Sequence, residues 1–453
     1  MRAALAVALS LCACGDKDTP DAPQDTEREP DTDTDGDGDG VPASEDCDDG
    51  DPLVWREFDR REGSMSAGFA ELCPGYCERG LSGTLDLSEA TPEEVATLGC
   101  LTHVRGGLKI TGNAALTSLT GLHSLRTVDG KVSIAGNNRL MSLSGLERLT
   151  YVNDNLEIVS NPALKSISSL GNLSRVVDEL NVRDNPALTS LVGLDALSEA
   201  EYVRIQGNHT LKDLTGLGSL NTLKGIHVKN NDGLTSLAGL DAFPYKIGWV
   251  TVTGNDALTS LAGLENLRML RDALLISHNP ALTSLTGLKA LNQVDGYFNI
   301  ISNDALPNLK GLERLSSVDY LYLRDNAALE SLDGLEKLDL VYVINLHNND
   351  KLTSLLALGR LEYILGLFIV DNDTLTGLEG LENLDWISEL TLENNLTLTS
   401  LSALSSLEAV YGVLLVTDNA ALCEDEPDAL IAKLDYVPAI MTLSGNTGTC
   451  PSE

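Results

Sequence analysis

Apolar and polar residues alternate in a short segment that recurs along most of this chain, and an asparagine follows each copy of the segment. Leu108 and Ile110 precede Asn113 in this way, and their period of two predicts a short β-strand. Behind the asparagine, leucines return every three residues, beginning with Leu116 and Leu119. That spacing is not helical. It indicates further short strands and turns, with the leucines pointing into a common core.

Intervals of 23 or 24 residues separate the recurring asparagines, for example Asn113 from Asn137 and Asn208 from Asn231. A period of this length predicts a solenoid in which each repeat forms one coil, with its strand parallel to the strand of the next coil. The predicted fold is therefore a mainly β, parallel β-helix or leucine-rich-repeat-like solenoid of about 14 coils over residues 107–419. We expect the asparagine side chains to be buried and hydrogen-bonded to one another and to turn carbonyls. The asparagines of this predicted ladder are Asn113, Asn137, Asn161, Asn185, Asn208, Asn231, Asn255, Asn279, Asn303, Asn326, Asn349, Asn372, Asn395 and Asn419.

Two other positions of the repeat carry a recurring residue type. A glycine stands eight residues after most of the asparagines, as at Gly121 and Gly287, and predicts a turn without room for a side chain. In later coils an acid or amide stands directly before the asparagine. This column consists of Asp325, Asn348, Asp371, Asn394 and Asp418. Such a column could hold calcium or supply paired carboxylates, but Asp and Asn also favour turns, and we prefer the turn interpretation.

The segment GLKITGNAALTSLTGLHSLRTVDG at residues 107–130 resembles the repeat of receptor L domains, the leucine-rich β-helices of receptor ectodomains and bacterial surface proteins. CLTHVRGGLKI at residues 100–110 is similar to the capping cysteine and first strand of that family. The resemblance covers roughly residues 73–450 and implies a right-handed solenoid that binds other molecules and is not catalytic.

The N-terminus has the pattern of an export signal. A basic residue, Arg2, precedes a short apolar run over residues 3–11, which is too short to span a bilayer. The following Leu-Cys-Ala-Cys-Gly resembles a bacterial lipobox, which implies cleavage after residue 13 and lipidation of Cys14. Gly15 is not the aspartate that retains some lipoproteins in the inner membrane, so we expect a lipid anchor in the outer membrane or at the cell surface. An ordinary export signal with incidental cysteines is the alternative.

Net charge is −36 and the isoelectric point is about 4.3, which disfavours nucleic-acid binding because that function needs a basic surface. Residues 15–60 alone hold 18 acidic and 4 basic side chains. We expect residues 14–62 to form a solvated tether, residues 63–106 an N-terminal cap, and residues 420–453 a C-terminal cap.

Six cysteines remain after Cys12 and Cys14 are set aside, and all of them flank the repeats. Their number and their place beyond the ends of the core predict capping disulfides in an exported protein. Six cysteines allow 15 pairings. We favour Cys423–Cys450, Cys77–Cys100 and Cys47–Cys73.

The tether contains an acidic segment with calcium-loop spacing. Alternate carboxylates followed by Gly40 match the first positions of such a loop, and a backbone carbonyl and later acids can complete the ligand set. The expected ligands are Asp35, Asp37, Asp39, Val41, Asp46 and Asp48. The segment resembles thrombospondin type 3 calcium repeats, and a disordered acidic linker is the alternative.

Residues two, four and six positions before each ladder asparagine should point outward from the strands and form an exposed sheet face. Aromatic and arginine side chains, which carry much of the energy of interfaces, gather in these columns. Aromatics also favour sheets for packing alone. The candidate ligand-binding residues are Arg183, Tyr202, Arg204, His227, Trp249, Tyr297, Tyr320, Tyr322, Arg324, His347 and Phe368.

No nucleophile–base–acid motif, phosphate loop or histidine-rich metal motif stands out in the sequence, so we expect a protein that is not an enzyme. The leading hypothesis is a lipid-anchored surface protein whose solenoid binds a protein or glycan in adhesion or recognition. A structural spacer without a specific ligand and a glycan-active β-helix enzyme are the alternatives.

Overall fold

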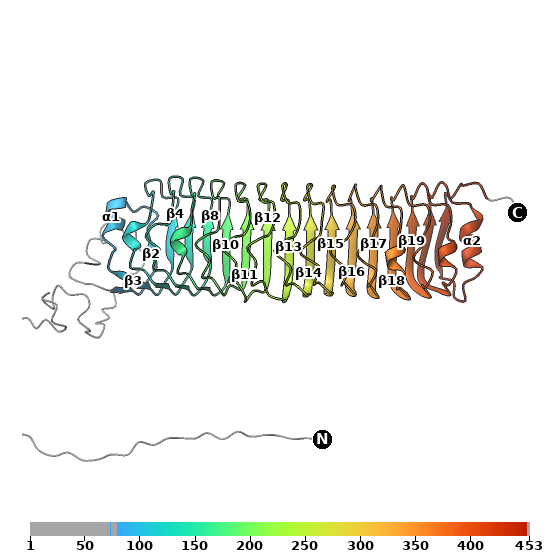
Figure 1. Cartoon of the computed structure of the whole chain (residues 1–453), viewed down its shortest axis with the longest axis horizontal. Helices are drawn as coiled ribbons and strands as arrows, with labels where there is room; N and C mark the ends of the chain where they lie inside the picture. The colour runs from blue at the N-terminus through green and yellow to red at the C-terminus, as the bar shows by residue number, and fades with distance from the viewer. Residues whose placement is uncertain (1–72, 74–78, 451–453) are drawn as a thin grey trace, which may run out of the picture. The chain divides into compact units, whose positions relative to one another are not determined.

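A computed structural model describes Cys73 and residues 79–450, which form a parallel β-solenoid of about 15 turns (Figure 1). Strands of successive coils pair in parallel, with Leu108 opposite Val132 and Ile110 opposite Ile134. The predicted fold class is therefore confirmed. The expected export signal, the lipidated Cys14 and the calcium loop lie outside the described residues.

Two parallel sheets run along the described coils. The smaller has five strands: β1 (Arg79–Leu81), β3 (Leu101–Val104), β5 (Thr127–Val128), β7 (Tyr151–Val152) and β9 (Arg175–Val176). The larger has sixteen: β2 (Leu85–Asp86), β4 (Leu108–Thr111), β6 (Val132–Ala135), β8 (Leu156–Val159), β10 (Glu179–Arg183), β11 (Tyr202–Gln206), β12 (Gly225–Lys229), β13 (Lys246–Thr253), β14 (Met269–Ser277), β15 (Gln293–Ile301), β16 (Ser317–Arg324), β17 (Leu340–His347), β18 (Tyr363–Val370), β19 (Trp386–Glu393), β20 (Ala409–Thr417) and β21 (Ile440–Ser444).

Strands lengthen along the solenoid. β4 has four residues, whereas β13 and every later strand up to β20 has eight or nine. The nine-residue β15 lies beside the eight-residue β16, and their register shifts between Val294 and Tyr297. The extra residue of the longer coil is thus absorbed as an irregularity within the strand, and the ladder asparagines on either side stay aligned.

Leucines fill the core. In the coil after Asn279 the four leucines spaced by three residues, Leu282, Leu285, Leu288 and Leu291, are fully buried, as is the largest core side chain, Phe298. One continuous apolar cluster extends from Leu81 to Leu434. Because each coil contributes only a thin layer, the apolar surface of a coil is covered mainly by its two neighbours.

The expected ladder asparagines are buried, and each joins three coils. Asn279 is typical: its backbone N–H donates to Asn303 Oδ1 at 3.3 Å, and its Nδ2 donates to the Val252 carbonyl at 3.1 Å. Its Oδ1 accepts from the backbone N–H of Asn255 at 3.1 Å. Asn446 adds a fifteenth member, because its Oδ1 accepts from the Asn419 N–H at 3.2 Å. Asn446 lies outside the predicted ladder because it follows Asn419 after 27 residues instead of 23 or 24.

The residue before every ladder asparagine, Asn446 included, has left-handed backbone geometry. Five of these residues are glycine and ten are not, with φ between 52° and 74° throughout. Asp and Asn tolerate this conformation better than other non-glycine residues. This is the position of the Asp and Asn column, which therefore consists of turn residues. The ten are Ser160, Asp184, Asn230, His278, Ser302, Asp325, Asn348, Asp371, Asn394 and Asp418.

The recurring glycine lies where one coil touches the preceding one. At Gly287, φ is 115° and a Cβ would overlap the Leu261 carbonyl oxygen. Three coils have Ser169, Ala357 or Ala403 at this position, and each forms a 3₁₀ turn there instead. These turns are η3 (Ser168–Leu170), η4 (Leu356–Leu358) and η5 (Ser402–Leu404), and a fourth, η2 (Thr120–Leu122), contains Gly121. A residue with a side chain at this position is thus accommodated by a 3₁₀ turn, and Gly121 shows that glycine also fits one.

A disulfide lies near each end of the described solenoid. Cys423–Cys450 is confirmed. The predicted Cys77–Cys100 and Cys47–Cys73 pairings are wrong, because Cys100 is bonded to Cys73. Both observed bonds join cysteines 27 residues apart, with Cα–Cα distances of 5.5 and 4.8 Å. A separation of about one coil brings two Cα atoms within disulfide reach, and both observed bonds use it.

Short helices accompany both disulfides. α1 (Pro92–Ala96) begins at Thr91, whose hydroxyl accepts from the Glu94 N–H at 3.2 Å while the Glu94 carboxylate accepts from the Thr91 N–H at 2.8 Å. This reciprocal pair is a capping box. α2 (Asp425–Ile431) follows Cys423 and turns Pro427 and Leu430 inward. Within the described residues, neither helix has the length and apolar content needed to cross a bilayer.

Asn279→Leu should lower the free energy of unfolding by about 3 kcal/mol, because it leaves the buried Asn255 N–H and the Val252 carbonyl of the preceding coil without their hydrogen-bond partner. Urea denaturation of the full chain measures the change. Thr283→Ala, at an exposed position of the same coil, should change it by less than about 0.5 kcal/mol. A loss below about 1 kcal/mol for Asn279→Leu would contradict a structural role for the ladder.

Gly287→Ala should destabilise the fold by about 2 kcal/mol or more, since it adds both a clash and an unfavourable φ. The reciprocal change Ala357→Gly, in a coil that already uses a 3₁₀ turn, should cost about 1 kcal/mol or less. Denaturant melts of the two variants provide the comparison, and equal losses would refute the link between this glycine and the turn type.

Candidate binding face

The eleven candidate residues lie on one surface of the larger sheet, which we call the outer face: the side chains two, four and six residues before the ladder asparagines on β10–β18. Register places Tyr297 opposite Tyr320, and Tyr322 between Asn299 and Asn345. All eleven side chains are half-buried or exposed. They lie on β10 (Arg183), β11 (Tyr202, Arg204), β12 (His227), β13 (Trp249), β15 (Tyr297), β16 (Tyr320, Tyr322, Arg324), β17 (His347) and β18 (Phe368).

Tyr202, His227 and Trp249 form a first group, which we call the tryptophan cluster. The Trp249 ring lies over Gly225, where a Cβ would overlap it, and its centroid is 4.1 Å from that of His227. Tyr202 and Trp249 are nearly parallel at 6.1 Å. Burial lowers the pKa of His227, and the positive charge of Arg204 acts in the same direction. The imidazole of His227 therefore stays neutral at pH values below those at which a histidine usually becomes protonated.

Tyr297, Tyr320, Tyr322, Asn299 and Asn345 form a second group, the tyrosine–asparagine cluster. The ring of Tyr297 stacks on Tyr320 at 4.9 Å and lies 6.1 Å from Tyr322, and its side chain remains 49% exposed. Burial raises the pKa of the Tyr322 phenol, and the neighbouring tyrosines add to the effect. Asn299 Oδ1 and Asn345 Oδ1 are shielded from solvent and have no hydrogen-bond donor.

Unpaired, shielded amide oxygens are uncommon in folded proteins, because each lost hydrogen bond costs about 1–3 kcal/mol. Here two of them flank one phenol on adjacent strands. His347 Nδ1 lacks a partner as well, although its Nε2 contacts Asp371 Oδ2 at 3.2 Å. Polar groups around Tyr322 thus retain unused hydrogen-bonding capacity next to an exposed aromatic surface.

Two arginines of the outer face form local ion pairs. Arg204 Nε lies 3.0 Å from Glu179 Oε1, and Arg183 Nε lies 3.5 Å from Asp184 Oδ2. Arg324 is exposed and forms no ion pair within residues 79–450. Beside the tyrosine–asparagine cluster the face therefore offers one cation that no ion pair occupies in the described chain.

The Asp and Asn column beside this face forms hydrogen bonds along its length. Asn348 Nδ2 donates to Asp325 Oδ1 at 2.7 Å, and Asn394 Nδ2 donates to Asp371 Oδ1. Because Asp and Asn alternate from Asp325 to Asp418, successive carboxylates of this column are two coils apart, or about 10 Å. The Asp and Asn residues of this column are therefore turn residues in which an Asn amide donates to the neighbouring Asp. No two carboxylates of the column lie close together.

A second row of aromatic residues was missed by the sequence analysis. Tyr363 stacks on Trp386 at 5.3 Å, Trp386 meets Tyr411 at 5.9 Å, and Tyr411 meets Tyr436 at 5.2 Å. These four residues lie eight to ten positions before their ladder asparagines, outside the three columns that were considered. Their spacing of 23 to 25 residues, close to the repeat period, was the sequence signal that could have revealed this row.

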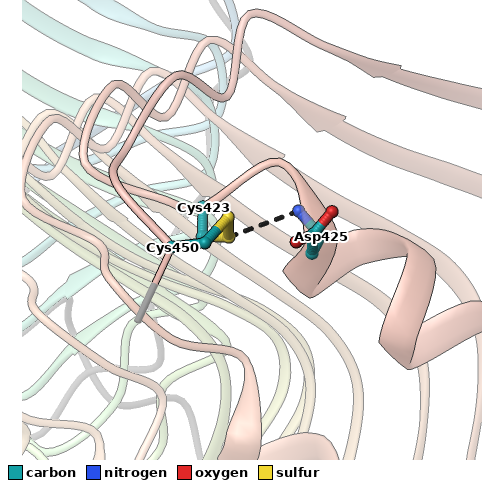
Figure 2. Close-up of side chains that lie close together, drawn as sticks. All are labelled: Cys423, Asp425 and Cys450. Atoms are coloured by element: carbon teal, nitrogen blue, oxygen red, sulfur yellow. Dashed lines mark hydrogen bonds between the residues drawn. A yellow bond between two sulfur atoms is a disulfide. The ribbon is translucent and has the colours of Figure 1, made fainter. Parts of the chain in front are cut away.

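One group in the described chain has the composition of a metal site: Cys423, Asp425 and Cys450 (Figure 2). The two sulfurs are joined in the disulfide, so neither is a thiolate able to bind a metal. The backbone N–H of Asp425 donates to Cys423 Sγ at 3.4 Å. The cluster is therefore a capping disulfide beside the first turn of α2.

A comparison with protein-family models and with curated proteins gives no match for this chain.

Trp249→Ala should raise the pKa of His227 toward 6.5, since it removes the ring that buries the imidazole. Because the folded-state pKa lies below the unfolded one, the wild type loses stability as pH falls through about 6.5, and the variant should lose less. An NMR titration of the imidazole carbon-bound protons measures the pKa. Trp386→Ala, on β19, is the control. An unchanged His227 pKa in Trp249→Ala would show that residues other than Trp249 bury the imidazole.

Proposed function

We propose that this protein is a non-catalytic, surface-anchored lipoprotein whose solenoid binds a protein or glycan through the outer face. The observation that carries the proposal is the tyrosine–asparagine cluster, where exposed aromatic surface lies beside amide oxygens that lack donors. Aromatic side chains supply interface energy at low entropic cost, and a partner with hydroxyl or amide donors would use the unpaired acceptors.

The scaffold supports this role. Tyr297, Tyr320 and Tyr322 stand on strands whose ends are joined by the ladder bonds of Asn303 and Asn326. Their backbones are thus held in place before a partner arrives, which reduces the entropy lost on binding. Arg324 at the edge of the cluster adds a donor for an acidic or hydroxylated group.

The proposed anchor rests on the N-terminal sequence. Lipidation at Cys14 would tie the chain to an outer membrane or cell surface, and the acidic stretch over residues 15–60 would hold the solenoid away from it. Calcium bound by Asp35, Asp37 and Asp39 would stiffen part of that stretch. The resemblance of residues 107–130 to the receptor L-domain repeat supports a recognition role.

A spacer without a specific ligand is the second candidate function. The unbroken ladder from Asn113 to Asn446 favours it, since a continuous array of paired coils is stiff whether or not its surface binds anything. The two functions differ in one respect that can be measured: a spacer does not depend on the tyrosines of the outer face.

Replacing Tyr297, Tyr320 and Tyr322 together with serine should weaken binding at least tenfold, because two or three interface aromatics usually contribute more than about 1.4 kcal/mol. The full chain with Cys14→Ser is applied to a glycan array and to detergent extracts of bacterial envelopes. The matched control replaces Tyr363, Tyr411 and Tyr436 with serine, and circular dichroism checks that both variants are folded.

Loss of binding only in the outer-face variant would support recognition through this cluster. Loss only in the control variant would move the site to the second aromatic row. A folded wild type that binds nothing on the array or in the extracts would refute the recognition proposal and favour the spacer.

A further inference from the structure

The last described coil leaves its core-facing side partly open. Met441 on β21 is paired in register with Leu414 on β20, and both occupy the position five residues before their ladder asparagines. Leu414 is fully buried, whereas Met441 is 42% exposed. Leu443, the next core-facing residue of β21, is only partly buried. α2 and the disulfide therefore do not cover this part of the coil.

The backbone is also unpaired at the outer edge of β21. At the equivalent position of earlier coils the N–H donates forward, from Leu108 to the Lys131 carbonyl and from Val132 to the Asn155 carbonyl. Strand β21 has no following strand in the described chain. The N–H of Met441 therefore faces the free edge.

The turn after β21 also has backbone N–H groups without acceptors in the described part of the chain. Asp418 N–H donates to the Ser444 carbonyl in the next coil, and Asn419 N–H donates to Asn446 Oδ1. The corresponding N–H groups of Gly445 and Asn446 have no acceptor among the described residues. The ladder thus ends on open donors beside the open strand edge.

Side chains around this edge are apolar and uncharged. Ile440 is 61% exposed, and Val437 and Tyr436 are exposed beside it. No Asp, Glu, Lys or Arg occurs between residues 436 and 450, although the chain carries a net charge of −36. β21 also lacks the lysine or proline that commonly protects a free edge strand from pairing.

We propose that β21 is an assembly edge at which a second copy of this chain adds its own β21 in antiparallel orientation. A twofold axis relates two identical edges only when the strands run antiparallel, and each edge then supplies the donors and acceptors that the other needs. Ile440 and Met441 of the two copies are brought together. The uncharged stretch allows two strongly acidic chains to approach at this place.

The acidic first turn of α2 makes the proposed association depend on salt concentration. Asp425, Glu426 and Asp428 lie near the same end of the solenoid, and their repulsion between copies opposes pairing. Added salt screens exposed charges, so association should strengthen as ionic strength rises. A contact confined to one strand edge is small, and the dissociation constant should lie at roughly 1–100 µM.

Sedimentation equilibrium of the full chain carrying Cys14→Ser tests the proposal, because this change removes association driven by the proposed lipid. The wild type should pass from monomer to dimer between about 1 and 500 µM, and the dimer should be favoured at 0.5 M relative to 0.05 M sodium chloride. Met441→Pro should weaken the dimer at least tenfold. It removes an edge N–H without breaking a bond to β20. Met441→Leu is the matched control and should dimerise as the wild type does.

Hydrogen exchange of the Gly445 and Asn446 amides provides the second measurement. Protection that appears with dimerisation would support pairing at this edge. A chain that stays monomeric over the whole range would overturn the proposal. So would a dimer that Met441→Pro leaves unchanged. Protection of these amides in the monomer would also contradict it, since a segment of the same chain would then cover the edge.

Discussion

Every coil of this protein must turn a corner while its backbone is buried, and a buried amide without a partner is costly. The ladder asparagine resolves this conflict, because one side chain both accepts from and donates to the main chain of the preceding coil. The rest of the coil is arranged around it. The residue before it takes positive φ in all fifteen cases, and strand length changes by one residue while the asparagines stay in line.

Close stacking is the second constraint, and it acts at the recurring glycine. At most of these glycines, positive φ lets the turn press against the carbonyl of the previous coil, as Gly287 does on Leu261. Where Ala357 or Ala403 replaces it, a 3₁₀ turn accommodates the Cβ. The solenoid therefore tolerates two solutions at this corner but only asparagine at the ladder, from Asn113 to Asn446.

Local periodicity explains why so much of the fold was predictable. Strand alternation, leucine spacing and the asparagine interval are all properties of single coils, so the sequence carried them directly. The Cys73–Cys100 bond was missed because Cys77, 23 residues before Cys100, also lies about one coil away, so the repeat period does not distinguish the two cysteines. Asn446 was missed because residues 425–431 form a helix inside the last coil and lengthen the interval.

The candidate site was less accessible to sequence reasoning. Its columns could be placed on one face, but the unpaired oxygens of Asn299 and Asn345 depend on how neighbouring side chains pack. The row from Tyr363 to Tyr436 lies on a part of the coil where no outward column was expected. Regular strands thus position the outer face, and its chemistry arises from irregular details of the side chains.

The asparagine ladder holds the coils together through buried side chain-to-backbone bonds. Native-state hydrogen exchange of the backbone N–H groups of Asn255, Asn279 and Asn303 tests it most directly. If the ladder holds the coils, these turn amides should exchange as slowly as the amides of the neighbouring strands β14 and β15, because all of them open cooperatively. Exchange at the rate of exposed turn amides, while the strands stay protected, would contradict it.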